Sequence, residues 1–194
     1  MPRILSQVLF SLSLVAVVLA ESDSESKQAE ESKAIAYQSL EIRKSLFGDF
    51  SMLAQERDDY ATTLTRLALE NVHVDPNDEK GIAEARRLIA LALHLSPRNR
   101  TAVVSNHQLG KGLLPEKKEA DYSRLVFARL LLTRGRLLKE QKGEADQFVG
   151  RCFIELAAQL NPRNEEAVYD FEIQKFDNKE VDWSVFTAQE AASE

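Results

Sequence analysis

The sequence predicts an all-α protein, and three observations support this class. Apolar residues recur at the three-to-four-residue spacing of an amphipathic helix through most of the chain. Only 7 Gly and 5 Pro occur among 194 residues, which favours long helices over many tight hairpins. No segment alternates strictly between apolar and polar residues, as a half-buried strand would. We therefore expect antiparallel helical hairpins that stack on one another.

Residues 1–20 have the pattern of a secretory signal peptide. The positive charge of Arg3 precedes the apolar run VLFSLSLVAVVLA, which ends at the small residue Ala20. This run is shorter than the roughly 20 apolar residues that a membrane-spanning helix needs. We expect cleavage before Glu21 and export to the periplasm or out of the cell. The alternative is an envelope protein that residues 4–20 anchor to the membrane.

The mature chain divides into three parts. Residues 21–33 are polar and acidic without periodicity, which predicts a disordered lead-in. Residues 34–175 carry the helical pattern and form the predicted domain. Residues 176–194 are acidic, and we expect a largely flexible tail. This tail contains a small apolar cluster, Trp183, Val185 and Phe186, which we expect to dock either on the chain itself or on a partner.

Seven helices are predicted within the domain. Glycine and proline separate them, because both residues end helices, and Asp or Asn after the break can cap the next helix. The longest internal loop contains Gly110, Gly112 and Pro115. The predicted helices span residues 33–47, 51–72, 79–95, 99–109, 120–141, 144–160 and 164–175.

The chain contains an internal repeat. Residues 85–103 and 150–168 align without a gap at an offset of 65 (Pro97 against Pro162, 162 − 97 = 65), and ten of the nineteen positions are identical. The shared Pro-Arg-Asn turn goes beyond the apolar matching that any two amphipathic helices show. Such repeats indicate units that bury their apolar faces against neighbouring units.

The repeated positions resemble a known family. Ala85, Ile89, Ala92 and Pro97 recur as Gly150, Ile154, Ala157 and Pro162. This spacing resembles the second helix and closing proline of the tetratricopeptide repeat. The resemblance implies a short solenoid of stacked hairpins, with helices that approach closely at the small residues. It also implies a groove, lined by the first helix of each hairpin, that holds an extended peptide.

The predicted helix 120–141 is apolar almost all round, which indicates a helix packed between neighbours. One line along it stays polar: Tyr122, Arg129, Thr133, Arg136 and Glu140. The resemblance makes this line the candidate peptide- or protein-binding site. The alternative is a solvated seam with an Arg136–Glu140 ion pair.

The charge distribution bears on partners. The net charge of −6 argues against nucleic-acid binding. Residues 80–163 hold 16 basic and 8 acidic residues, whereas residues 164–194 hold 2 and 9. This asymmetry indicates that the tail docks on the basic body or that an acidic partner does, unless the charges are simply solvated.

No motif names a reaction. The three histidines occur outside any metal-binding motif, the single Cys152 lies in an apolar pattern that predicts burial, and Asn99 in its glycosylation sequon is first a helix cap. We expect no cofactor, no metal and no catalysis, but an exported interaction adaptor for a protein or peptide. Membrane contact is expected only if the signal segment is retained. The alternative is a small exported enzyme or accessory subunit with a site near the 107–112 loop, using His94 or His107.

Overall fold

The computed structural model describes residues 35–42, 44–48, 51–118 and 121–187. Within these residues every regular element is a helix, which confirms the all-α class. The predicted signal peptide and the predicted lead-in lie outside the described residues.

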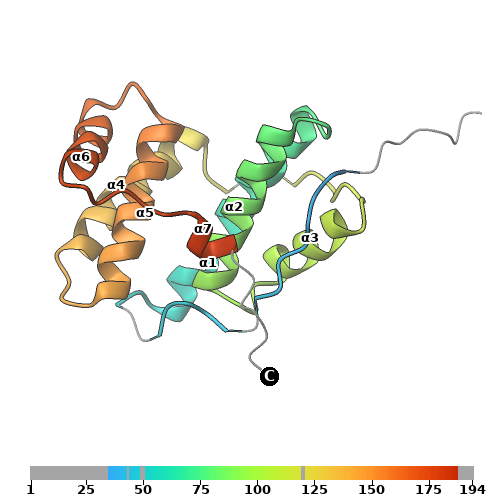
Figure 1. Ribbon diagram of the computed structural model, residues 1–194, viewed down its shortest axis with the longest axis horizontal. Coiled ribbons are helices and arrows are strands. Elements are labelled where there is room, and N and C mark those ends of the chain that lie inside the picture. The colour runs from blue at the N-terminus through green and yellow to red at the C-terminus, as the bar shows by residue number, and fades with distance from the viewer. Residues whose placement is uncertain (1–34, 43, 49–50, 119–120, 188–194) are drawn as a thin grey trace, which may run out of the picture. The chain divides into compact units, whose positions relative to one another are not determined.

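The described helices form two hairpins, each followed by a further helix (Figure 1). The first hairpin consists of α1 (Ala54–Val74) and α2 (Glu79–Leu95), followed by α3 (Arg100–Gly110). The second consists of α4 (Arg124–Lys139) and α5 (Glu144–Leu160), followed by α6 (Glu165–Phe176). The one-turn helix α7 (Ser184–Thr187) ends the described chain.

Side-chain caps fix where most of these helices begin. Asp78 accepts hydrogen bonds from the backbone N–H groups of Lys80 and Gly81 at the start of α2. Ser123 caps α4 in the same way, so this helix begins four residues later than the predicted start at residue 120. Each cap satisfies N–H groups that have no partner inside the helix.

The internal repeat extends to the hydrogen bonds of its turns. The N–H of Ser96 donates to the carbonyl of Ala92 at 2.9 Å, and the N–H of Asn161 donates to the carbonyl of Ala157 at 3.1 Å. Three residues later, Asn99 caps α3 and Asn164 caps α6. The identical Pro-Arg-Asn sequences therefore form the same turn between two helices in both halves of the repeat.

Asn99 has a further role that its counterpart lacks. Its Nδ2 donates to Thr62 Oγ1 at 2.8 Å and to Asp58 Oδ1 at 3.0 Å, and both acceptors lie on α1. Only 2% of Asn99 is exposed. The amide therefore fastens the α2–α3 corner to α1, and the sequon nitrogen is buried.

The small residues of the repeat lie where helices meet. A β-carbon on Gly150 would lie 2.7 Å from the carbonyl oxygen of Gly135, so α4 and α5 approach more closely than a side chain allows. The other repeated helix positions are fully buried in α2 and α5: Ala85, Ile89, Ala92, Ile154 and Ala157. Pro97 and Pro162 are exposed at the corners.

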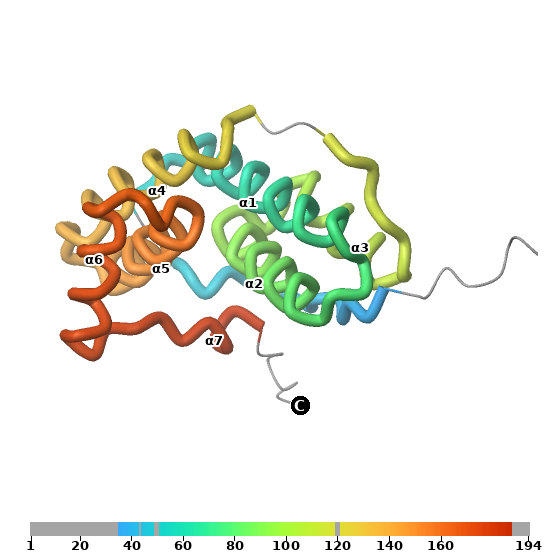
Figure 2. The backbone as a smooth tube through the Cα atoms, turned by 90° about the horizontal axis from the view of Figure 1, so that it is seen from above, coloured from blue at the N-terminus to red at the C-terminus, as the bar shows by residue number. Residues whose placement is uncertain are grey.

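The two hairpins pack with their first helices antiparallel. Arg124 at the start of α4 pairs with Glu70 near the end of α1 at 3.5 Å. Arg134 near the end of α4 pairs with Glu56 in the first turn of α1 at 2.7 Å. Figure 2 shows α1 and α4 running side by side in opposite directions. The two hairpins are therefore related by an approximate twofold rotation and not by a translation alone.

The predicted helix over residues 33–47 is wrong. The described residues 35–42 and 44–48 carry no helix and lie along α2 and α3. Asn106 of α3 accepts from the N–H of Leu40 at 2.9 Å and donates to its carbonyl at 3.0 Å, while His94 Nδ1 accepts from the N–H of Leu46 at 3.1 Å. Side chains of the two helices thus satisfy backbone groups that a helix would pair internally. This segment buries four large side chains: Ile35, Tyr37, Leu40 and Phe47.

The helix predicted over residues 120–141 does pack between two neighbours, α5 and α1, but part of its apolar surface is left uncovered. Helix α4 packs closely against α5, meets α1 along one edge and pairs with α6 through Arg136. Large apolar side chains remain exposed on it: Leu125, Val126, Leu130 and Leu137. The sequence could not distinguish a helix surrounded by neighbours from one with a spare apolar face, because both have the same composition.

Candidate functional site

A groove of about 380 Å³ lies between α1 and α4. Its floor and walls combine aromatic and aliphatic side chains with a few polar groups. Exposed apolar residues of α4 continue from it over the protein surface. The groove is lined by Leu53, Gln55, Glu56, Asp59, Tyr60, Thr63, Tyr122, Phe127 and Leu130.

Tyr60 anchors the floor of the groove. Its ring stacks on Phe153 of α5 with centroids 5.1 Å apart and lies 5.7 Å from the ring of Phe127. Its hydroxyl donates to the carbonyl of Leu130 at 3.4 Å. Burial, reinforced by the carboxylate of Glu56, raises the pKa of Tyr60 to about 12. The phenol is therefore neutral at physiological pH and presents a polar tip on an apolar floor.

The charges that line the groove are acidic. Glu56 is neutralised by Arg134 at one end. Asp59 accepts a hydrogen bond from Gln55 at 3.0 Å, and no cation of the described residues forms an ion pair with it. The groove therefore offers apolar contact along its length and an uncompensated carboxylate at its rim.

The predicted polar line of α4 does not come together at this groove. Tyr122, just before α4, lines it. Arg129 and Thr133 on α4 and Glu140 just after it are exposed and are not among the lining residues. Arg136 instead binds α6, where its guanidinium meets Asp170 at 2.6 Å and Glu166 at 2.8 Å. Hydrogen bonds to these two carboxylates raise the pKa of Arg136.

Sequence reasoning missed most residues of the groove. Tyr60 and Leu130 carry the same helical spacing as the core, so periodicity alone assigns them to the interior. Their position at an edge depends on the antiparallel packing of α1 and α4. No local signal in the sequence specifies that packing.

The tail cluster packs on the chain itself. Phe186 is 1% exposed, and its ring lies 5.9 Å from Phe47 and 5.4 Å from Phe148. Trp183 lies under the guanidinium of Arg87, 4.4 Å from the ring centroid. Val185, by contrast, is 41% exposed.

A buried carboxylate holds Trp183 in place. The indole N–H donates to Glu155 Oε1 at 2.8 Å, and Arg87 Nη1 lies 3.9 Å from the same oxygen. Burial raises the pKa of Glu155 above its usual value, although Trp183 and Arg87 act in the opposite direction.

We expect replacement of Glu155 by Gln to change how stability depends on pH. A raised pKa means that the folded protein binds the proton of Glu155 more tightly than the unfolded chain does. The protonated side chain therefore stabilises the fold at pH values below its unfolded pKa, and this stabilisation is lost as pH rises through the folded pKa. Glu155→Gln keeps an oxygen for Trp183 but cannot ionise. Urea unfolding should therefore show the variant gaining stability over the wild type as pH rises above about 4.5. A stability difference between Glu155→Gln and the wild type that does not vary with pH would contradict this prediction. The same pH-dependent difference in Glu140→Gln, at an exposed site, would also contradict it.

The residues of the enzyme alternative lie apart. His94 is buried at the end of α2, where its ring lies 5.6 Å from that of Phe186. His107 and Lys111 are exposed at the end of α3. Cys152 is buried, and burial raises the pKa of its thiol. In the described part of the chain no three His, Cys, Asp or Glu side chains gather in a way that could hold a metal.

Comparisons with known proteins add no assignment. No protein-family model, no curated protein and no solved structure matches this chain. None of the helices in the described ranges is long and apolar enough to cross a membrane. The site must therefore be interpreted from its own geometry.

Proposed function

We propose that this protein is an exported adaptor, built from two similar helical hairpins, that binds a peptide segment of a partner protein in the α1–α4 groove, without catalysis of its own. The groove itself carries the proposal. It is an apolar concavity of about 380 Å³ that opens onto the exposed apolar face of α4. Exposed apolar surface beside a groove is typical of protein-interaction sites.

The chemistry of the rim specifies the peptide. Large apolar side chains of the peptide would pack on Leu130 and on the ring of Tyr60, both of which are partly buried in the groove. A lysine or arginine of the peptide would reach Asp59, whose carboxylate has no cationic partner in the described ranges. We therefore infer a segment with large apolar side chains followed or preceded by a basic one.

Selection from a displayed peptide library on the purified protein tests this proposal. We expect enrichment of peptides that combine apolar anchors with Lys or Arg. A selected peptide should bind at least tenfold less tightly to Leu130→Glu, because a charge would be buried in the contact. Asp59→Lys should weaken peptides with a basic residue more than variants of them that carry Gln instead.

Leu113→Glu provides the matched control, because Leu113 is an exposed leucine in a loop away from the groove. If Leu113→Glu weakened peptide binding as much as Leu130→Glu, the peptide would bind outside the α1–α4 groove. Failure to enrich any peptide that competes for the Leu130 surface would reject the proposed function.

The export part of the proposal has its own test. N-terminal sequencing of the protein from its native envelope should give a chain that starts at Glu21. Retention of residues 1–20 in the membrane fraction would instead support the anchored alternative.

A further inference from the structure

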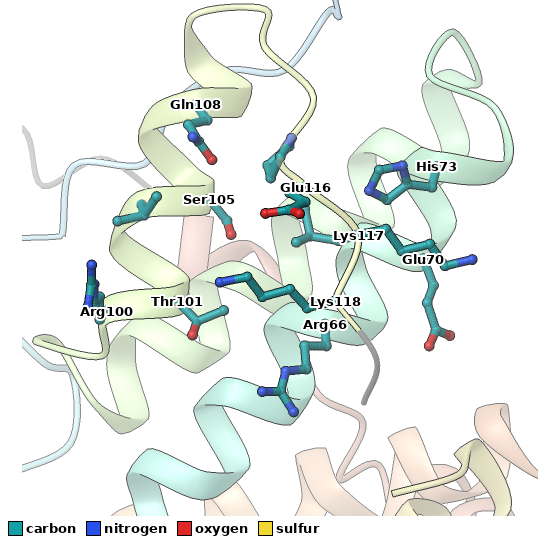
Figure 3. Close-up of a pocket in the computed structure, with 13 residues that line it drawn as sticks. Arg66, Glu70, His73, Arg100, Thr101, Ser105, Gln108, Glu116, Lys117 and Lys118 are labelled. Carbon is teal, nitrogen blue, oxygen red and sulfur yellow. The ribbon is translucent and has the colours of Figure 1, made fainter. Parts of the chain in front are cut away.

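A second cleft, separate from the α1–α4 groove, lies between α1 and α3 (Figure 3). Its volume is about 330 Å³. One wall is the C-terminal half of α1, the other is one face of α3, and the chain from Pro115 to Lys118 passes over it. The groove and this cleft share no lining residue.

The two walls present polar groups toward each other. On α3, Thr101, Ser105 and Gln108 follow at helical spacing and supply two hydroxyls and an amide. Figure 3 shows Lys118 extending from the overlying chain toward Thr101, and the carboxylate of Glu116 turned toward Ser105. The Thr101 end of the cleft is therefore the cationic end.

Counting the ion pairs shows that positive charge is left over. Two lining residues are already neutralised by partners outside the cleft: Arg66 pairs with Asp121, and Glu70 pairs with Arg124. The other charged lining residues, Arg100, Lys117, Lys118 and Glu116, form no ion pair within the described ranges. Arg100, Lys117 and Lys118 against Glu116 leave an excess of two positive charges among these lysine, arginine and glutamate side chains.

Two nitrogen atoms in the wall on α1 are also unsatisfied. Nε2 of His73 and Nε of Arg66 are buried and have no hydrogen-bond partner among the described residues. Buried nitrogen atoms normally find a partner, because an unpaired one loses its hydrogen bonds to water. Because neither atom is accessible from the cleft, a ligand would contact the exposed lysines and the side chains of α3 instead.

We propose that this cleft binds the phosphate group of a small polar molecule. A phosphate monoester carries between one and two negative charges at neutral pH and offers three acceptor oxygens. This charge matches the excess of the cleft, and lysine and arginine are the usual partners of phosphate. The hydroxyls of Thr101 and Ser105 and the amide of Gln108 suit the hydroxyl groups of a sugar-like body. The volume fits a ligand of that size.

Isothermal titration of the purified protein with inorganic phosphate and with glucose 6-phosphate tests this site. We expect saturable binding of both, with the sugar phosphate tighter, and no binding of glucose at the same ionic strength. The double variant Lys117→Gln/Lys118→Gln should bind the sugar phosphate at least about tenfold less tightly. Both side chains are exposed, so this variant should keep the fold.

The matched control is Lys80→Gln/Lys142→Gln, which removes the same charge from exposed sites outside the cleft. Equal weakening in the control would attribute binding to diffuse charge and overturn the site. Lack of saturation up to about 10 mM sugar phosphate would also overturn it. So would tighter binding of citrate than of the sugar phosphate, because the chemistry would then be that of a carboxylate. The peptide groove is tested with different variants, so either proposal can fail alone.

Discussion

Phe186→Ala should lower the free energy of unfolding by about 3 to 5 kcal/mol, the usual cost of emptying a buried phenylalanine site. Phe186 is almost fully enclosed, and its ring contacts Phe47 before α1, Phe148 on α5 and His94 on α2. Its removal would leave a cavity where both hairpins and the N-terminal segment meet. Urea unfolding followed by circular dichroism measures the change.

Val185→Ala is the neighbouring control. Val185 is 41% exposed, so its truncation should change the free energy of unfolding by no more than about 0.5 kcal/mol. Equal effects of the two variants would mean that the tail does not bury Phe186 in solution. An unchanged free energy of unfolding in Phe186→Ala would contradict the burial of this ring between the two hairpins.

Gly150→Val should destabilise the second hairpin by about 3 kcal/mol. Even the β-carbon at this position would lie 2.7 Å from the carbonyl oxygen of Gly135 and 2.9 Å from the backbone nitrogen of Lys139. Because both atoms belong to the backbone of α4, the helices would have to separate. Valine forms helix better than glycine by only about 0.5 kcal/mol, so the clash decides the sign. The thermal midpoint and the urea midpoint should both fall.

Gly48→Ala separates this effect from glycine replacement in general. A β-carbon on Gly48 meets no atom within 4 Å, and its backbone lies outside the positive-φ region. Stability should therefore stay the same or rise by up to about 1 kcal/mol. Wild-type stability in Gly150→Val would contradict the close approach of α4 and α5.

Much of the local structure follows from the sequence alone. The helices around the repeat are predicted closely, and α5 has the predicted bounds, because proline, glycine and Asn caps act within a few residues of where they stand. The repeat also identifies which residues line the helix contacts, since Gly150 and Ala85 occupy equivalent positions.

The segment over residues 33–47 shows where this reasoning fails. Its apolar spacing fits a helix, yet its described residues form none, and Asn106 and His94 pair with its backbone instead. These partners lie 48 residues or more away in the sequence. A local pattern contains no information about such distant partners, so tertiary packing overrides it.

The candidate sites also depend partly on local sequence and partly on tertiary packing. Residue chemistry in the sequence determined that the chain forms helices, where most of them end and which two hairpins are alike. Only the tertiary structure decided that α1 and α4 run antiparallel, which places Tyr60 and Leu130 in one groove. It also decided that α3 faces α1, which places Thr101 and His73 in one cleft. The physical reason is range: caps and periodicity act within a few turns, whereas a groove exists only after distant faces have packed.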